Sequence, residues 1–453
     1  MRKMDAAEAC SPTSSKAVQT NRGPLLSGPS ACRKPPLNRI CLNLSGGRRS
    51  RDGLPTRWGA AVPGALPGVV KATVFFAWRQ SRIGEEEPVG KRILGMFRRD
   101  AVLTISLCLA AVSCLAVPPT GAYLSYIDWN TLIILFCLML IVGGLRRQNF
   151  LQYIAGRLLS GVGSARRLVL TLVLLSFFSS MVMTNDVALL TFVPLGMLLL
   201  RMARLRVYIC RTVALMTIAA NLGSMFTPIG NPQNLYLFGL SGLSIPEFLR
   251  LTGPYTAASA ALLLLCVLFG YRQSRLSIEV GESTPLNWRV IGVYLALFLL
   301  CVSTVGGLLP HWVLLVLVTS VLLGMDRKLF GTADYALLLT FVFFFIFVGN
   351  LKQLDQLREW ISGALLGRER LVSVLVSQVI SNVPAAMLLS GYSGSIPELI
   401  IGTNLGGLGT LIASMASLIS YKQVVNQYPQ EKKLYFLIFT LLNVGFLLLL
   451  CQI

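Results

Sequence analysis

Apolar segments long enough to enter a lipid bilayer recur from residue 101 to the end of this 453-residue chain, and they restrict its fold more than any other feature. A helix needs about 20 predominantly apolar residues to cross the hydrocarbon core. Only 13% of the residues are charged, against about 25% in a soluble domain. The sequence therefore predicts an all-α polytopic membrane protein, multi-pass in the cytoplasmic membrane. The apolar segments are 101–118, 130–145, 168–200, 212–240, 253–271, 290–306, 311–325, 336–350, 371–397, 398–420 and 434–451.

Residues 1–97 precede these segments and are rich in Arg, Pro, Gly and Ser. They show no sustained helical or strand period, and we interpret them as a disordered basic extension. Met96 opens the run MFRRDAVLTISLCLAAVSCLAV and is a candidate for the natural start. The net charge of +21 does not indicate a nucleic-acid partner, because the basic residues beyond the extension flank apolar segments, where they orient a membrane protein.

The segment 168–200 fits a re-entrant helical hairpin better than a simple span. As one helix its 33 residues would measure about 50 Å against a hydrocarbon core of about 30 Å. As two full spans with a turn it is too short, and Arg at both ends places both ends on one side. We expect two arms of roughly 16 residues, with Thr184-Asn185-Asp186 at the tip.

Three further segments carry polar or helix-breaking residues inside their apolar runs. The segment 371–397 has a second polar break, Ser381-Asn382, followed by Pro384, which fits the first turn of a new helix. The motifs NLGSMFTPIGNPQN (221–234) and NLGGLGTLIASMAS (404–417) interrupt two further spans. Gly and Pro there break the helix and free backbone groups that must find partners.

These features recur in the same order, which predicts two repeats. IVGGL at 141–145 matches FVGNL at 347–351, and the tips and NLG motifs pair in the same order. We place the first repeat at 98–275, a linker with one extra span at 276–310, and the second repeat at 311–453. The extra span inverts the second repeat, and two inverted repeats with hairpins and broken helices indicate a secondary transporter with a midplane site.

The basic residues indicate the orientation. If Arg98 and Arg99, and with them the N-terminus, are cytoplasmic, 19 of the 24 Lys and Arg from residue 98 onward lie inside. The five outside are Arg250, Lys352, Arg358, Arg368 and Arg370.

The tips and breaks carry the chemistry that this pattern predicts. A helix C-terminus offers free carbonyl groups suited to a cation, and a helix N-terminus offers N–H groups suited to an anion. Two tips and two breaks could surround one anion and one or two cations without a buried Arg or Lys. The candidate substrate- and ion-binding residues are Thr184, Asn185, Asp186, Asn221, Gly223, Thr227, Gly230, Asn231, Ser381, Asn382, Asn404, Gly406 and Thr410.

Asp186 is the leading functional candidate, because an intramembrane carboxylate is costly. It could bind Na+ together with Asn185, or take up and release a proton. The alternative is a helix cap that faces trapped water. Capping is also the alternative for Asn185 and Asn382, and satisfaction of broken backbone is the alternative for Thr227, Asn231 and Thr410.

The motifs MTNDVALLTFVPL, NLGSMFTPIGNPQNLYLF and SQVISNVPAAMLL resemble the ion transporter superfamily. They are most similar to its citrate-transporter-like and arsenite-permease-like anion permeases, which are related to the divalent anion/sodium symporters. The resemblance covers about residues 98–453. It implies a scaffold part and a transport part that moves as an elevator, a homodimer, and a small anionic or oxyanion substrate coupled to Na+ or H+.

The tips depart from the symporter branch, whose paired Ser-Asn-Thr tips contact substrate carboxylate and Na+. Asn185 and Asn382 match that pattern, whereas Asp186 and Val383 replace the two Thr residues. A carboxylate at a tip repels a dicarboxylate unless it is protonated or holds a cation. The sequence is closer here to the antiporter and arsenite-permease branches, where such an Asp suggests cation or proton coupling.

Four hypotheses follow for the function. The first is an ion-coupled transporter of an organic carboxylate, a citrate-like anion or an arsenite-like oxyanion, and the second is a Na+/H+ antiporter that uses Asp186. An integral membrane enzyme is disfavoured, because the chain has one His, no G-x-x-x-x-G-K loop and no His cluster for a metal. We expect no cofactor and no structural metal. A non-transporting membrane scaffold predicts neither polar tips nor an internal inversion.

Overall fold

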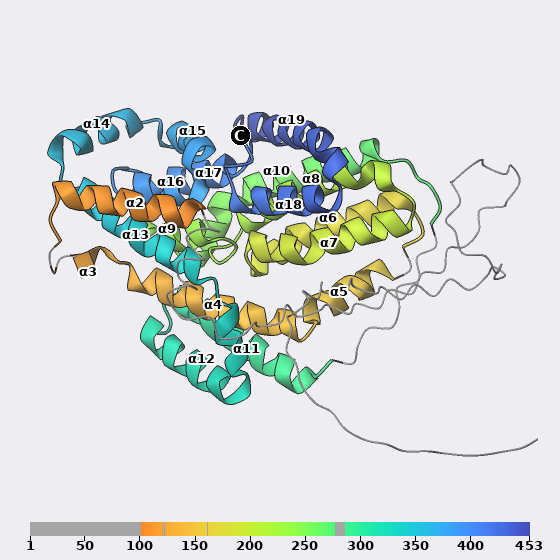
Figure 1. The fold of residues 1–453 in the computed structure, drawn as a ribbon, viewed down its shortest axis with the longest axis horizontal. Coiled ribbons are helices and arrows are strands. Elements are labelled where there is room, and N and C mark those ends of the chain that lie inside the picture. Colours follow the sequence, from red (N-terminus) through yellow and green to blue (C-terminus); the bar gives the residue numbers. More distant parts are fainter. Residues whose placement is uncertain (1–100, 120, 122, 161, 277–285) are drawn as a thin grey trace, which may run out of the picture. The chain divides into compact units, whose positions relative to one another are not determined.

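The computed structural model describes residues 101–119, 121, 123–160, 162–276 and 286–453, without the side chains of 101, 357 and 358. These residues form helices and no strand, apart from one isolated antiparallel bridge between Ser164 and Arg275 (Figure 1). The basic extension at 1–97, with the candidate start at Met96, lies outside the described residues.

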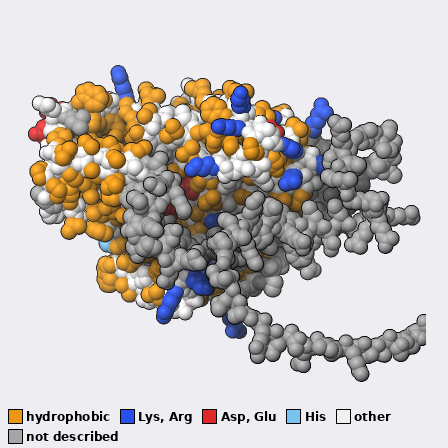
Figure 2. All heavy atoms as spheres, in the orientation of Figure 1, with side chains coloured by type: hydrophobic (Ala, Val, Ile, Leu, Met, Phe, Trp, Pro, Cys, Tyr) orange, Lys and Arg blue, Asp and Glu red, His pale blue; other side chains and the backbone are white. Residues whose placement is uncertain are grey.

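Seven of the described helices are long and apolar enough to cross a membrane. They are Trp129–Arg147, Ala165–Val182, Asn185–Met202, Arg206–Ser224, Ile245–Gly270, Trp288–Val305 and Pro429–Leu450. Three shorter apolar helices accompany them: Val102–Ala116, His311–Met325 and Tyr335–Leu351. Large apolar side chains such as Leu299, Val316 and Leu441 are exposed, and hydrophobic side chains cover much of the face in Figure 2. The prediction of an all-α polytopic membrane protein is confirmed, since such a surface suits lipid.

Each half contains a helical hairpin, α6–α7 or α15–α16, that is followed by an interrupted span and a final long helix. The first half holds α2 (Ala101–Ala116), α3 (Tyr123–Tyr126), α4 (Trp129–Arg147), α5 (Phe150–Leu159), α6 (Ala165–Val182), α7 (Asn185–Met202), η1 (Arg206–Tyr208), α8 (Ile209–Ser224), α9 (Pro232–Ser241) and α10 (Ile245–Gly270). The second half holds α12 (His311–Met325), η2 (Arg327–Thr332), α13 (Tyr335–Leu351), α14 (Asp355–Leu365), α15 (Glu369–Ile380), α16 (Asn382–Ser390), α17 (Ile396–Gly406), α18 (Met415–Gln427), η3 (Pro429–Glu431) and α19 (Lys432–Leu450). Between them lies the extra span, α11 (Trp288–Val305). The inverted orientation, the repeat boundaries and the elevator motion stay predictions.

Both polar tips lie at turns between packed helical arms. The first hairpin is α6–α7, with Met183 and Thr184 between the arms, and the second is α15–α16, with only Ser381 between them. The arms of the first hairpin have 18 residues each, or about 27 Å. Our argument that 168–200 is too short for two spans is therefore wrong, because the helices continue through Arg167 and Arg201.

The second hairpin is shorter than the hydrocarbon core. Its arms have 12 and 9 residues, or about 18 and 14 Å. Pro384 is the third residue of α16, so it occupies the first turn of that helix as predicted. These lengths suit a re-entrant hairpin, which enters and leaves the membrane on one side.

Helices α8 and α9 are the two half-helices of the first interrupted span, and α17 and α18 are those of the second. We call the segments between them, 225–231 and 407–414, the first and the second break. Hairpin α6–α7 packs against α8, and hairpin α15–α16 packs against α17. The second half-helix of each pair crosses over: α18 packs against α7 and α8, whereas α9 packs against α16 and α17 (Figure 1). A separate set of contacts joins α2 to α13 and α4 to α11 and α12. The tips and breaks of both halves therefore meet in one interior region.

Candidate functional site

The first tip has no side-chain N-cap of the usual kind. Thr184 precedes α7 in an extended conformation, and its side chain makes no capping hydrogen bond. Oδ1 of Asn185, the first residue of α7, accepts a hydrogen bond from the backbone N–H of the next residue, Asp186, at 3.0 Å. This bond leaves the amide nitrogen of the buried Asn185 side chain for another partner, and the binding role of Asn185 stays a prediction.

The second tip repeats this arrangement. Oδ1 of Asn382 accepts from the backbone N–H of Val383, again at 3.0 Å. Ser381 has a positive φ of 77°, a conformation that only Gly adopts without strain. Two bonds hold it there: Asn382 N–H donates to the carbonyl of Ala413 at 2.9 Å, and Ser381 Oγ donates to the same oxygen at 3.3 Å. The second tip is thus fastened to the end of the second break.

Asn221 joins the first tip to the second half of the chain. Its Oδ1 accepts from Asn185 Nδ2 at 2.9 Å and from Ser414 Oγ at 3.1 Å. Its own Nδ2 donates to the carbonyl of Gly407 at 3.3 Å and to Ser417 Oγ at 3.5 Å. This buried amide therefore ties one tip to the opposite break.

Asn404 makes the reciprocal connection from the second half to the first break. Its Oδ1 accepts from Asn231 Nδ2 at 2.9 Å, and its Nδ2 donates to Asn234 Oδ1. Asn231 caps α9 by accepting from the backbone N–H of Asn234 at 2.9 Å. Asn221 and Asn404 lie 183 positions apart, and the same shift relates Asn231 to Ser414 and Asn234 to Ser417. The two breaks are thus crosslinked by matching residues.

The predicted glycines occur where helices approach too closely for a side chain. A Cβ on Gly223 would collide with the carbonyl of Phe177, and a Cβ on Gly406 would collide with Ser377 in the other hairpin. Gly230 lies against the backbone of Ser224 within the first break. These three residues therefore position the breaks on the hairpins.

Thr227 and Thr410 bind backbone at the ends of the hairpin arms. Thr227 Oγ1 donates to the carbonyl of Met181 at 2.5 Å, near the end of α6. Thr410 Oγ1 donates to the carbonyl of Gln378 at 3.1 Å, near the end of α15. Each satisfies one of the carbonyls that a helix leaves unpaired at its end, and the binding role of both threonines stays a prediction.

Asp186 has an acceptor without a partner. Its Oδ1 is buried, and no described group donates a hydrogen bond to it. The three ion pairs between described side chains lie elsewhere, at Arg147–Asp326, Arg206–Glu431 and Arg370–Glu398. A carboxylate inside a membrane helix is a candidate for binding a cation or a proton, and this role of Asp186 stays a prediction.

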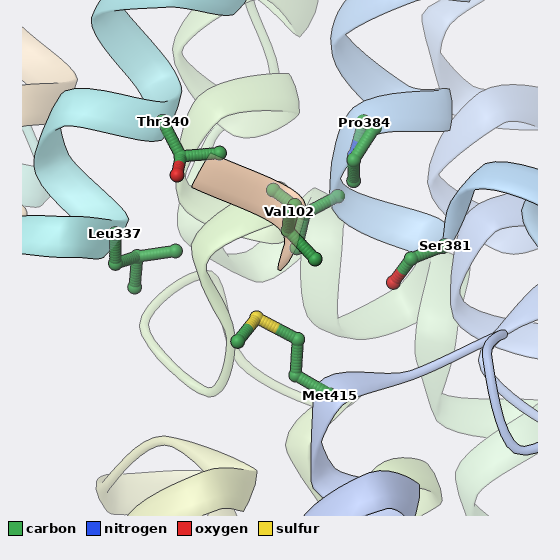
Figure 3. Close-up of a pocket in the computed structure, with 7 residues that line it drawn as sticks. Val102, Leu337, Thr340, Ser381, Pro384 and Met415 are labelled. Atoms are coloured by element: carbon green, nitrogen blue, oxygen red, sulfur yellow. The ribbon is translucent and has the colours of Figure 1, made fainter. Parts of the chain in front are cut away.

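The surroundings of the second tip are apolar by contrast. A cavity of about 10 Å³ lies beside Ser381, Val383 and Pro384, which is room for about one water molecule. The other lining residues are Val102, Leu337, Thr340 and Met415, from α2, α13 and α18 (Figure 3). The residue after the Asn of each tip is Asp186 at the first tip and Val383 at the second. One tip therefore carries a carboxyl group and the other an apolar side chain.

Four polar residues of this network are not among the candidates that the sequence predicts. Asn234, Ser414 and Ser417 belong to the two quoted break motifs, and each bonds to Asn221 or Asn404. Gln378 interrupts the apolar run LVSVLVSQVI and binds the second break. The sequence carried a signal for Asn234 and Ser417, because each lies three positions after a polar residue, Asn231 or Ser414, at the spacing of one helical turn.

Interrupted apolar helices that converge on a buried polar cluster are an arrangement found in secondary transporters. A family model described as "Citrate transporter" matches residues 90–395. The chain belongs to the citrate transporter family and is a multi-pass membrane transporter.

Curated relatives agree with this assignment. The chain is similar to the inner membrane protein YbiR of Escherichia coli (33% identical over 304 residues, 65% of this chain and 80% of that protein). It is similar to an uncharacterized transporter of Methanocaldococcus jannaschii (33% over 299 residues, 65% and 81%). It is also similar to a 46 kDa membrane protein of Mycobacterium leprae (27% over 339 residues, 65% and 78%).

Proposed function

We propose that the chain is a secondary active transporter that moves a small anion or oxyanion across the cytoplasmic membrane, coupled to Na+ or H+. The substrate class is an organic carboxylate, citrate-like, or an arsenite-like oxyanion. The observation that carries this proposal is the buried network in which Asn185, Asn221 and Asn404 connect the first tip and both breaks. Polar groups buried at membrane depth mark substrate and ion pathways.

The N-terminal ends of four helices supply the anion side of the site. Helices α7 and α16 begin at the tips, and α9 and α18 begin where the breaks end. Each presents backbone N–H groups and the positive end of its dipole, which attract an anion without Lys or Arg. The small cavity at the second tip implies that a citrate-sized substrate enters only after Ser381 and Val383 move away from α2 and α13.

Asp186 supplies the cation side. Its unpartnered Oδ1 repels an anion while it is charged, and this repulsion ends when a proton or Na+ binds. Uptake of the cation and of the anion are thereby linked, which is the requirement for coupled transport.

The second candidate is a Na+/H+ antiporter, and the same carboxylate favours it. Asp186 forms no ion pair with a described Lys or Arg, so it could exchange Na+ for H+ without any anion. The flux of an anion therefore separates the two candidates.

The test is thermal unfolding of the detergent-purified protein, followed by flux in proteoliposomes. The panel holds Na+, pH steps, citrate, succinate, sulfate, phosphate and arsenite, for wild type and Asp186→Asn. A ligand at a hundred times its Kd stabilises by about 2.7 kcal/mol. A rise in Tm with one anion that needs Na+ or low pH, and is lost in Asp186→Asn, supports the anion transporter. A response to Na+ or pH alone, with every anion silent, supports the antiporter.

A further inference from the structure

At each break, main-chain carbonyl groups lie at or beyond the C-terminal end of the first half-helix. A side-chain amide nitrogen donates hydrogen bonds to these oxygens. Converging carbonyl oxygens at membrane depth are the groups that coordinate Na+ in a discontinuous helix. Which atom occupies the centre of each set therefore decides whether the break is available to a cation.

In the first break this atom is Nδ2 of Asn234. It donates to the carbonyls of Ser224 at 3.3 Å, Met225 at 3.2 Å and Thr227 at 3.2 Å. Asn234 is fully buried, and its Oδ1 accepts from Asn404 Nδ2. The orientation of the amide is set by this neighbour, since only the nitrogen can face carbonyl oxygens while the oxygen faces a donor.

In the second break the atom is Nε2 of Gln378. It donates to the carbonyls of Gly406 at 3.0 Å and Leu408 at 2.9 Å, and to Val374 in its own helix at 3.2 Å. Its Oε1 accepts from the backbone N–H of Thr410 at 2.9 Å. Gly409, with φ +98°, gives this side chain its room, because a Cβ there would collide with Oε1. The amide thus satisfies donors and acceptors of the break together.

Residues at unrelated positions perform this task in the two halves. The shift of 183 that relates the breaks pairs Asn234 with Ser417, and the shift of 197 that relates the tips pairs Gln378 with Met181. Neither Ser417 nor Met181 has a side-chain amide group. The amide that donates to the carbonyl groups of a break therefore comes from α9 in the first break and from α15 in the second.

An amide nitrogen that already donates to these oxygens excludes a cation from them. Na+ could enter only if the amide left, and its N–H groups, which belong to a buried side chain at Asn234 and a half-buried one at Gln378, would then lose their partners. A neutral side chain with fixed donors satisfies the same oxygens permanently and at every Na+ concentration.

We propose that Asn234 and Gln378 close the two breaks to Na+, each standing where a bound cation would otherwise satisfy the freed carbonyls. They are positioning residues, which fix the backbone of the site without contacting the substrate. The inference deepens the proposed function: if that function holds, the coupling ion, Na+ or H+, binds at the first tip beside Asp186 and not in the breaks.

The experiment is thermal unfolding of the full chain, as wild type and as Asp186→Asn, in NaCl, KCl and choline chloride at equal ionic strength and pH, with no anion substrate. Asp186→Asn removes the carboxylate that could bind Na+ at the first tip, so any Na+ response that remains comes from elsewhere in the site. We expect the Tm of Asp186→Asn to be the same in all three salts. A saturable rise in the Tm of Asp186→Asn with Na+, absent in K+ and choline, would overturn the proposal.

Two variants give each break the residue of its counterpart in the other half: Gln378→Met and Asn234→Ser. We expect a lower Tm in choline for both and, in the Asp186→Asn background, a Na+-dependent rise in Tm that Asp186→Asn alone does not show. Gln356→Met, at an exposed amide of α14, and Asn443→Ser, at a buried amide of α19, are the matched controls and should show no Na+ response. An unchanged Tm for both Gln378→Met and Asn234→Ser would also overturn the proposal.

This experiment is independent of the proposed function. If no anion is ever transported, the proposed function fails, and the salt dependence of Tm still decides whether Asn234 and Gln378 close the breaks.

Discussion

The amide nitrogen of Asn185 donates to Oδ1 of Asn221 at 2.9 Å, and both side chains are buried. One residue begins the second arm of a hairpin and the other lies in the last turn of α8 before it breaks. This single bond therefore couples the position of the first tip to the position of the first break. Movement of either element changes the geometry of the same binding region.

Replacing Asn185 with Ala should weaken anion binding and destabilise the protein. The variant loses the cap on the Asp186 N–H and the bond to Asn221, and an unsatisfied buried group costs about 1–3 kcal/mol. Asn382→Ala should weaken binding from the opposite side of the site. The Kd is measured from the anion dependence of Tm. Asn443→Ala, a buried amide that donates within its own helix, should keep wild-type affinity; unchanged affinity in both tip variants would contradict the site.

Replacing Asp186 with Asn should abolish coupled transport and leave membrane insertion intact. The amide keeps the size of the side chain but neither binds a proton at physiological pH nor attracts Na+. Flux in proteoliposomes under imposed pH and Na+ gradients is the measurement, with size-exclusion chromatography as the folding control. Asp355→Asn, at an exposed position of α14, should transport as wild type does. Wild-type coupling in Asp186→Asn would remove this residue from the mechanism.

The Gly variant of Ser381 should be more stable than its Ala variant. Both lose the hydroxyl, but Gly adopts a positive φ without strain, and such strain costs about 1–3 kcal/mol. At Thr184, where φ is −62°, the order should reverse, with Ala more stable by about 0.4–1 kcal/mol. Chemical unfolding of the four variants gives both differences. The same order at the two tips would show that Ser381 is not strained.

Replacing Gly223 with Ala should destabilise the protein by about 1–3 kcal/mol or more. The added methyl group collides with the backbone of Phe177 in α6, which cannot move without displacing the hairpin. Gly239→Ala is the matched control, because Gly239 lies in helix α9 with open space around it, and Ala there should stabilise by about 0.5–1 kcal/mol. Equal Tm values for the two variants would contradict the close contact between α6 and α8.

The orientation of the halves can be tested at the two ends of α13. Lys328 and Lys352 flank this helix, and the charge distribution places Lys328 in the cytoplasm and Lys352 outside. In a cysteine-free background, an impermeant thiol reagent should label Lys352→Cys in intact cells and Lys328→Cys only in inverted vesicles. Labelling of both from one side would refute the orientation.

The sequence predicted the spans well because bilayer burial leaves a signal in every residue of a segment. The helix His311–Met325 begins and ends where the apolar run does. The hairpin arms were placed less well, since Arg166, Arg167, Arg201 and Met202 continue the helices beyond the apolar run. Apolar composition locates the membrane, whereas backbone hydrogen bonds decide where a helix ends.

The tips and breaks were also predicted, because Asn, Asp, Gly and Pro inside an apolar run need partners. Which residue supplies each partner could not be predicted. Asn221 bonds to Ser414 at a separation of 193 residues, and Gln378 reaches the second break from another helix. These pairings follow from the crossing of the half-helices, which a linear pattern does not encode.

The crossing of α9 and α18 also has a consequence for biosynthesis. Ser414 is 193 residues downstream of Asn221, and at about 5–20 residues per second a ribosome adds it roughly 10–40 seconds later. Throughout that interval the first half lies in the bilayer with a buried amide that lacks its partners from the second half. A nascent chain that stops short of residue 414 is therefore a ready target for membrane quality control, however well its own helices have inserted.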